Sequence, residues 1–271
     1  MPSIPKKPQG RAAQNRILSL EQANRESREK GLAAALDKWL VRFGRRAARD
    51  ARLGKVQKAD TPAKLKQELR DLLLKFGLQQ VNDAGARWSK TLGGVWVLPL
   101  SAKLDYTKEV ENKVRLIVKE TEQMIRDSIQ REISQAFRET PRPTRAEVAR
   151  RIATKFHGPP DAREGAFSPG RADRIAQTEL GDADTAGAAE GFAVSGVEKV
   201  GWLPRPNDGK SGERKHWKMA DHKALTIEDI QSSDSSRWFR LPSGARGRRP
   251  LDPMLPVGER VNCRCVLIPR R

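Results

Sequence analysis

Apolar residues recur at steps of three and four along most of the first 140 positions, the spacing of one buried face of an α-helix. The first such stripe lies in a helix that begins near residue 11 and includes Leu36 and Phe43. A second helix is expected to begin at Thr61-Pro62, because Thr61 is a suitable N-cap and proline is tolerated in the first turn. Gly93 and the glycine after it are expected to end that helical segment.

The longest predicted helix runs from about Tyr106 to Arg138, with apolar residues on one side and charged residues on the others. A helix of about 33 residues spans roughly 50 Å. It is therefore either a long member of a helical bundle or a strut through which copies of the chain associate. After a proline-rich linker, Thr144 and Glu147 have the spacing of a capping box, which predicts a short helix to about Phe156.

The second half of the sequence changes character. Ser168-Pro169 predicts the start of a helix, and the small residues in 183–189 would let a neighbouring element approach it closely. Residues 197–203 are typical of a strand, and an apolar strand containing Cys263 and Cys265 is expected near the C-terminus. We therefore expect a predominantly α-helical α+β protein. Its N-terminal region of long helices would cover residues 1–139, and a small α+β domain with a short sheet would cover residues 140–271.

The positive charge is concentrated at the two ends of the chain. The formal net charge is +19, of which residues 1–60 carry +9 and residues 237–271 carry +7. Such ends are typical of contact with a polyanion, and DNA is the leading candidate, although they could instead bind acidic protein surfaces or keep the chain soluble. The candidate DNA-contacting residues are Arg42, Arg45, Arg46, Arg49, Arg246, Arg248, Arg249, Arg270 and Arg271.

Five short segments of the second half occur in a distinctive order: Arg-Ile-Ala-Gln-Thr-Glu (174–179), Gly-Trp (201–202), Arg-Lys-His (214–216), Pro-Leu-Asp-Pro (250–253) and Asn-Cys-Arg-Cys (262–265). Together they resemble the phage Mu F-like head-morphogenesis family, the minor head proteins of tailed bacteriophages. The Asn-Cys-Arg-Cys segment is the most specific of the five. The motif residues that this resemblance singles out are Arg174, Thr178, Glu179, Arg214, His216, Asn262 and Arg264.

The resemblance implies a minor head protein that folds in the host cytoplasm and enters the virion near the portal vertex, where it assists head assembly or genome delivery. Its partners would be the portal protein, other head proteins and DNA bound without sequence preference, and its long helices could support oligomers. Two other functions stay open: a sequence-neutral DNA-binding accessory protein outside a virion, and a toxin-like or hydrolytic enzyme. The chain departs from the family where Trp217, Met219 and His222 replace a stretch that is often small residues and a glycine.

Four side chains are of the types that bind structural zinc: His216, His222, Cys263 and Cys265. On a strand, positions 263 and 265 point to the same face, as joint ligation requires. The alternative is that the thiols pack as small hydrophobic groups and no cofactor is bound. The sequence contains no P-loop, dinucleotide fingerprint or His-Glu-x-x-His motif, so we expect no catalytic activity. Nor does it contain an apolar run of about 18 residues, so we expect no contact with a membrane.

Overall fold

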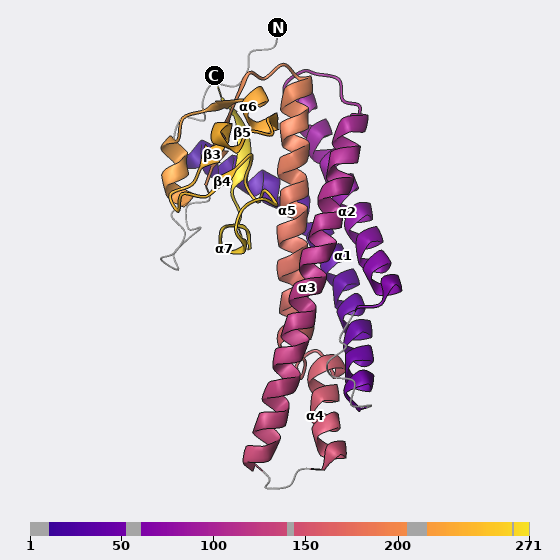
Figure 1. The fold of residues 1–271 in the computed structure, drawn as a ribbon. Helices are drawn as coiled ribbons and strands as arrows, with labels where there is room; N and C mark the ends of the chain where they lie inside the picture. Colours follow the sequence, from indigo (N-terminus) through magenta and orange to yellow (C-terminus); the bar gives the residue numbers. More distant parts are fainter. Residues whose placement is uncertain (1–10, 53–60, 140–143, 205–215, 262, 271) are drawn as a thin grey trace. The chain divides into compact units, whose positions relative to one another are not determined.

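The computed structural model describes residues 11–52, 61–139, 144–204, 216–261 and 263–270. The predicted class is confirmed, because long helices predominate and a small sheet follows them (Figure 1). The helices of the first part are α1 (Arg11–Arg52), α2 (Ala63–Thr91), α3 (Leu100–Glu139), α4 (Arg145–His157), η1 (Gly165–Phe167) and α5 (Pro169–Val194). They are followed by β1 (Lys199–Leu203), η2 (His216–Asp221), β2 (Leu225–Thr226), α6 (Ile227–Gln231), η3 (Ser235–Arg237), β3 (Phe239–Arg240), β4 (Arg246–Gly247), α7 (Val257–Arg260) and β5 (Val266–Arg270).

The described residues form two compact units, and each unit is assembled from segments far apart in the sequence. The first unit takes its residues from Met1–Glu29, Lys75–Lys108 and Gln177–Arg271, and the second takes them from Lys30–Leu74 and Glu109–Ala176. The predicted boundary at residues 139 and 140 falls inside the second unit. The physical reason is that α4 packs against α3, where the Nζ atom of Lys155 lies 2.7 Å from a carboxylate oxygen of Glu132.

In the second unit, the apolar stripe of α1 is buried as its spacing predicts. Leu36, Leu40 and Phe43 are all at most 2% exposed, and the indole Nε1 of Trp39 donates a hydrogen bond to the Leu65 carbonyl. The capping box of α4 is also confirmed, because Thr144 and Glu147 exchange both of its hydrogen bonds. A local sequence signal therefore determines where α4 begins.

In the first unit, small residues let α2 and α5 approach closely. A Cβ atom added at Gly187 of α5 would lie 2.2 Å from the carbonyl oxygen of Val81 in α2, and one added at Gly191 would lie 2.8 Å from that of Gly85. Since real Cβ atoms essentially never come so close, only glycine fits at these points of contact. The predicted close approach of a neighbouring element is confirmed, and that element is α2.

The three-stranded sheet of the first unit has the order β2-β1-β5, with both pairings antiparallel. Its central strand β1 pairs with β5 over its whole length, from Lys199↔Arg270 to Leu203↔Val266. The sheet, the β3–β4 pair and the helices α6 and α7 gather beside α5 (Figure 1). Side chains from the sheet, from α5 and from the end of α2 form one apolar core, which includes Trp88, Phe192, Trp202, Phe239 and Leu267.

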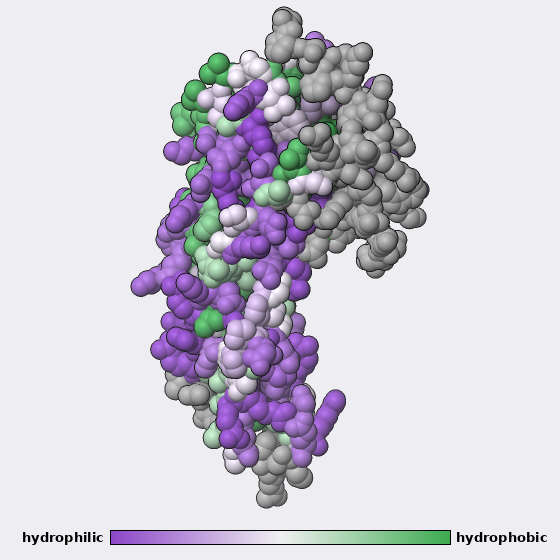
Figure 2. Space-filling model, turned by 180° about the vertical axis from the view of Figure 1, so that it is seen from behind, coloured by the Kyte–Doolittle hydropathy of each residue, from purple (hydrophilic) through white to green (hydrophobic). Residues whose placement is uncertain are grey.

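Most of the face drawn in Figure 2 is hydrophilic, and its hydrophobic residues lie in scattered patches. None of the described helices combines the length and the apolar character that crossing a membrane would need.

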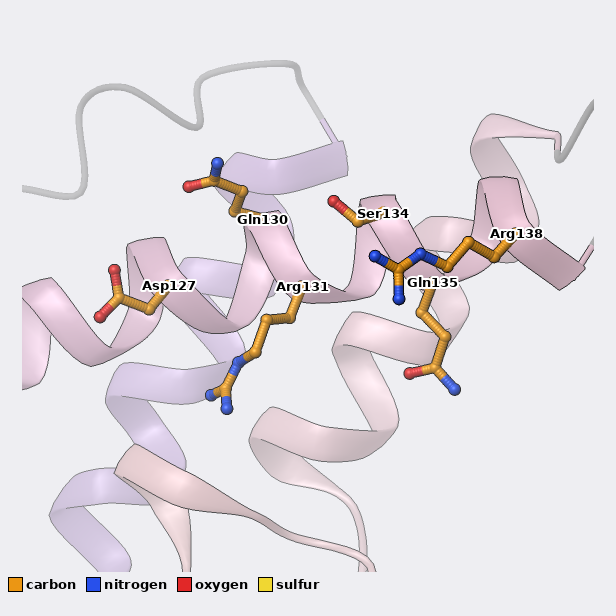
Figure 3. A pocket seen from close by; sticks show the side chains of 6 residues that line it. All are labelled: Asp127, Gln130, Arg131, Ser134, Gln135 and Arg138. Atoms are coloured by element: carbon orange, nitrogen blue, oxygen red, sulfur yellow. The ribbon is translucent and has the colours of Figure 1, made fainter.

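A hollow of about 800 Å³ lies along α3 in the second unit (Figure 3). Its described lining consists of polar side chains that project from this one helix: Asp127, Gln130, Arg131, Ser134, Gln135 and Arg138. This lining contains a single carboxylate and no histidine or cysteine. Among the described residues, the cluster of side chains that could hold a metal ion lies in the first unit instead.

Candidate metal centre

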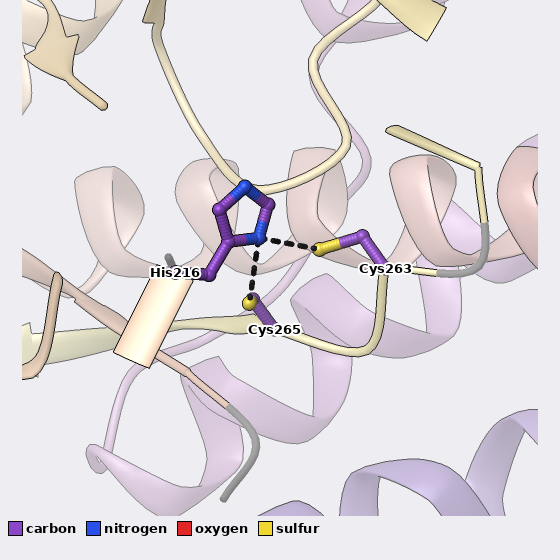
Figure 4. A group of neighbouring side chains, drawn as sticks. All are labelled: His216, Cys263 and Cys265. Atoms are coloured by element: carbon purple, nitrogen blue, oxygen red, sulfur yellow. Dashed lines mark hydrogen bonds between the residues drawn. The ribbon is translucent and has the colours of Figure 1, made fainter. Parts of the chain in front are cut away.

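Three side chains with metal-binding atoms meet in the core of the first unit (Figure 4). His216 opens η2, and Cys263 and Cys265 lie in the segment between α7 and β5. All three are buried, and the Nδ1 atom of His216 lies 3.6 Å from each of the two sulfur atoms. The prediction that the cysteines lie within the last strand is wrong, because β5 begins one residue after Cys265. The two sulfurs nevertheless face the same imidazole nitrogen, since the residues are two positions apart in an extended segment.

The cluster is held by the elements on either side of it. The backbone N–H of Cys263 donates to the Arg260 carbonyl at 3.0 Å, which ties the cysteine segment to the end of α7. On the other side, Trp202 of β1 is paired in register with Leu267 of β5, and its ring packs edge-on against His216 with centroids 5.8 Å apart. The geometry therefore depends on the sheet, and not on the short cysteine segment alone.

Glu259 fixes the orientation of the histidine ring. One of its carboxylate oxygens lies 2.7 Å from the Nε2 atom of His216, on the opposite side of the ring from the sulfurs. An ionised carboxylate can only accept, so in the neutral ring Nε2 carries the proton and Nδ1 presents its single lone pair to Cys263 and Cys265. One lone pair cannot accept two thiol hydrogens equally well. It can bind a cation that the two sulfurs also bind, and a carboxylate on the far nitrogen is the usual support of a metal-binding histidine.

The spacing of the three atoms fits a zinc ion. In a tetrahedral site with Zn–N near 2.0 Å and Zn–S near 2.3 Å, the nitrogen and each sulfur would be about 3.5 Å apart. The observed Nδ1–Sγ separations are both 3.6 Å, and all three ligand atoms lie within 4.8 Å of one another. One imidazole and two thiols are also ligands that zinc prefers. The two nitrogen–sulfur distances therefore suit a metal ion, and the two sulfurs would lie about 3.8 Å apart once both bind zinc.

The electrostatics of the cluster also favour a cation. Burial lowers the pKa of His216, but the hydrogen bond and negative charge of Cys263, together with the Glu259 carboxylate, outweigh it and raise the pKa overall. The neighbouring groups thus stabilise positive charge at a position that solvent does not reach.

The predicted fourth ligand, His222, is not part of this cluster. Its Nδ1 atom lies 3.0 Å from the backbone carbonyl oxygen of Lys223, and its ring packs edge-on against Phe239. The reason is that Phe239 also packs against Trp202, which contacts His216, so aromatic rings lie between the two histidines. Among the residues described, the cluster offers three ligands.

The described parts of the family motif lie in the first unit, apart from residues 174–176, which belong to the second. Glu179 of α5 is buried and accepts a hydrogen bond from Arg260 of α7 at 3.5 Å, and Arg264 donates to Glu29 of α1 at 3.0 Å. The Thr185 hydroxyl of α5 donates to the Pro250 carbonyl at 2.9 Å. These contacts join α5 to Pro250 and to α7, and they join the Asn-Cys-Arg-Cys segment to α1.

The remaining motif residues have different surroundings. Thr178 is buried in α5, whereas Arg174 of the same helix is exposed. Arg214 and Asn262 lie outside the described residues. Glu259 and Asp182 were not among the predicted site residues. The one feature of the sequence that could have pointed to Glu259 is its position four residues before Cys263. No part of the motif points to Asp182.

The predicted DNA-contacting arginines fall into two groups. Those of α1, namely Arg42, Arg45, Arg46 and Arg49, are exposed. Arg249 is buried and lies 2.9 Å from Asp182, so its assignment to DNA contact is wrong.

The other C-terminal arginines have partners within the chain. Arg248 pairs with Asp252 at 3.0 Å, and Arg246 donates to the carbonyls of Ser235 and Ser236. Arg270 is half-buried, and its side chain passes close to Gly201 of β1, whereas Arg271 lies outside the described residues.

Comparisons with known proteins identified no similar protein. The chain matches no protein-family model, and neither the curated proteins nor the solved structures include one that is similar to it.

Proposed function

We propose that the chain is a minor head protein of a tailed bacteriophage, which acts near the portal vertex and the packaged DNA in head assembly or genome delivery. The observation that best supports this proposal is the convergence of the motif segments. Four parts of the motif lie in one buried part of the first unit, although almost ninety positions of the sequence separate the first from the last. They are Glu179, Pro250, His216 and the Cys263–Cys265 segment. The imidazole of His216 in particular meets two cysteines that are 47 and 49 positions away.

Within this proposal, the cluster is a structural zinc site. His216 would bind the ion through Nδ1 and the two cysteines would bind it as thiolates, with Glu259 holding the ring. A bound zinc ion stabilises the folded form directly, because the unfolded chain does not present the ligands together. The ion would connect the start of η2 to the segment before β5. It would thereby stabilise β5, an edge strand of the sheet. The described residues of this part of the chain contain no disulfide that could do so.

The zinc site is tested by metal analysis of the purified full-length chain. We expect one equivalent of zinc in the unaltered protein and a loss of zinc in His216→Ala and in Cys265→Ser. His222→Ala is the matched control, since this histidine lies outside the cluster, and it should keep its zinc. X-ray absorption would show two sulfur ligands per ion. Less than half an equivalent of any transition metal in the unaltered protein would rule out the site.

The head-protein proposal is tested in particles. Quantitative mass spectrometry of purified phage particles from the strain that encodes the chain should find it in a few copies per particle. Binding to the purified portal protein should be measurable in a pull-down. If the particles contain none of this chain, the proposal is wrong, and a DNA-binding accessory role outside the virion becomes the leading alternative.

A further inference from the structure

The structure distinguishes two groups of arginines that the charge pattern of the sequence treats alike. In the C-terminal group, Arg249 pairs with Asp182, Arg260 with Glu179 and Arg248 with Asp252. Arg249 and Arg260 are also buried. The charges of these three arginines are balanced inside the first unit, where Arg249 and Arg260 hold the C-terminal segments against α5. It is therefore a poor candidate for contact with an external polyanion.

The second group lies on α1 in the second unit, where cations follow one face of the helix. Lys38, Arg42, Arg45 and Arg49 stand at steps of four, three and four residues, so they share one side, and all four are exposed. No acidic residue occurs between positions 38 and 49. We call these four residues the cationic stripe. It is roughly 16 Å long at 1.5 Å per residue.

The stripe is available to a ligand. Within the part of the chain that the structure describes, Lys38, Arg45 and Arg49 form no ion pair, and the exposed Arg42 pairs with the half-buried Glu68 at 2.9 Å. Arg42 would have to give up this carboxylate to bind a ligand, whereas the other three would not. The opposite face of α1 is buried through Trp39, Leu40 and Phe43, so the backbone that carries the stripe is held in place.

We propose that the cationic stripe binds the sugar-phosphate backbone of double-stranded DNA without reading its sequence. This deepens the proposed function by naming the surface that would meet the packaged genome, and it rests on that function for its biological setting. Four like charges at intervals of roughly 4.5 to 6 Å along a straight helix complement a line of regularly spaced phosphates. Arginine also binds phosphate in a bidentate manner. Phosphate contacts of this kind position a protein on the duplex and carry no sequence information.

The test compares two variants that lose the same charge. The stripe variant is Lys38→Gln/Arg45→Gln/Arg49→Gln, and the control variant is Lys103→Gln/Lys199→Gln/Lys223→Gln, which removes three exposed lysines of the first unit. Glutamine retains a good helix propensity, and circular dichroism would verify that both variants fold. Binding would be measured by fluorescence anisotropy with two duplexes of equal length and unrelated sequence, at roughly 50 to 200 mM salt.

We expect the stripe variant to bind both duplexes about tenfold or more weakly, with the slope of log K against log salt reduced by about 2 to 3. The control variant should stay close to the unaltered protein. Three results would overturn the proposal: no binding by the unaltered protein at low salt, equal losses in both variants, or a stripe variant that binds DNA normally but no longer binds the portal protein. The last result would assign the stripe to an acidic protein surface.

Incorporation into particles separates this proposal from the proposed function. A stripe variant that enters particles but no longer binds DNA supports both proposals. A chain that binds DNA through the stripe but is absent from particles overturns only the head-protein function.

Discussion

The Glu259 carboxylate lies 2.7 Å from the Nε2 atom of His216, while both cysteine sulfurs face the other nitrogen of the same ring. Removing a carboxylate of this kind typically weakens metal binding by about 10- to 100-fold. We therefore predict that Glu259→Ala binds zinc more weakly by that factor, with Glu259→Gln in between. A chromophoric chelator competition would measure the change.

Glu228→Ala is the control for that experiment, because Glu228 is an exposed acid of the same unit. If Glu259→Ala and Glu228→Ala bind zinc equally tightly, Glu259 does not support the metal ligand.

A second prediction concerns the buried pair of Asp182 and Arg249. Asp182→Ala leaves the buried guanidinium of Arg249 without its partner carboxylate. The free energy of unfolding should fall by about 3 kcal/mol. This is the lower end of the usual range, because Asp252 also lies near Arg249. The double variant Asp182→Leu/Arg249→Met should be more stable than Asp182→Ala, since it removes both charges of the buried pair. Urea unfolding would measure both. A single variant within about 0.5 kcal/mol of the unaltered protein would show that the pair is unimportant.

The close packing of α2 on α5 can be tested at one glycine. Gly187→Ala would place a methyl group 2.2 Å from the Val81 carbonyl, so the helices must separate, at a cost of about 1 to 3 kcal/mol. Gly170→Ala, near the start of the same helix, meets no atom closer than 4.0 Å and should be neutral or slightly stabilising. Thermal unfolding of the two variants should shift in different directions. Equal shifts would contradict the close contact.

The stability of the protein should depend on pH through Glu21. Burial and the charge of Asp184 raise its pKa from 4.5 to about 7, although Arg87 acts in the opposite direction. Between these two values the folded form holds a proton that the unfolded form has lost, so the free energy of unfolding falls as pH rises. The full effect is at most about 3 kcal/mol.

Glu21→Gln should flatten this dependence between pH 4.5 and 7, whereas Glu198→Gln, which removes an exposed acid, should leave it unchanged. Urea unfolding at several pH values would measure it. A stability that rises with pH over this interval in the unaltered protein would contradict the assignment.

Features that depend on neighbours in the sequence could be predicted, because their physical causes are local. The Thr144–Glu147 capping box and the helix start at Ser168-Pro169 need only a few adjacent residues. The pairing of His216 with the two cysteines could be proposed because only a few residue types bind zinc well. The sequence could not show that His222 lies outside the cluster, because the position of His222 depends on how Phe239 and Trp202 pack in three dimensions.

The division into two compact units could not be predicted from the sequence, because it too depends on how distant segments pack together. Each of α1, α2, α3 and α5 contributes residues to both units, so no linker or change of composition marks where one unit ends. The burial of Arg249 was hidden in the same way. An arginine in a Gly/Arg-rich loop looks exposed until its partner is known, and Asp182 lies 67 positions away.

The hydrogen bond between Glu29 and Arg264 joins residues 235 positions apart. During synthesis, the second unit has all its segments once Ala176 has left the ribosome, whereas the first must wait for β5 to pair with β1. Until then, the N-terminal part of α1 and the apolar core around Trp202 lack their covering strand, and such nascent surfaces are prone to aggregation. Release of the last strand, and not the earlier formation of the helices, is therefore the step at which a chaperone would matter most.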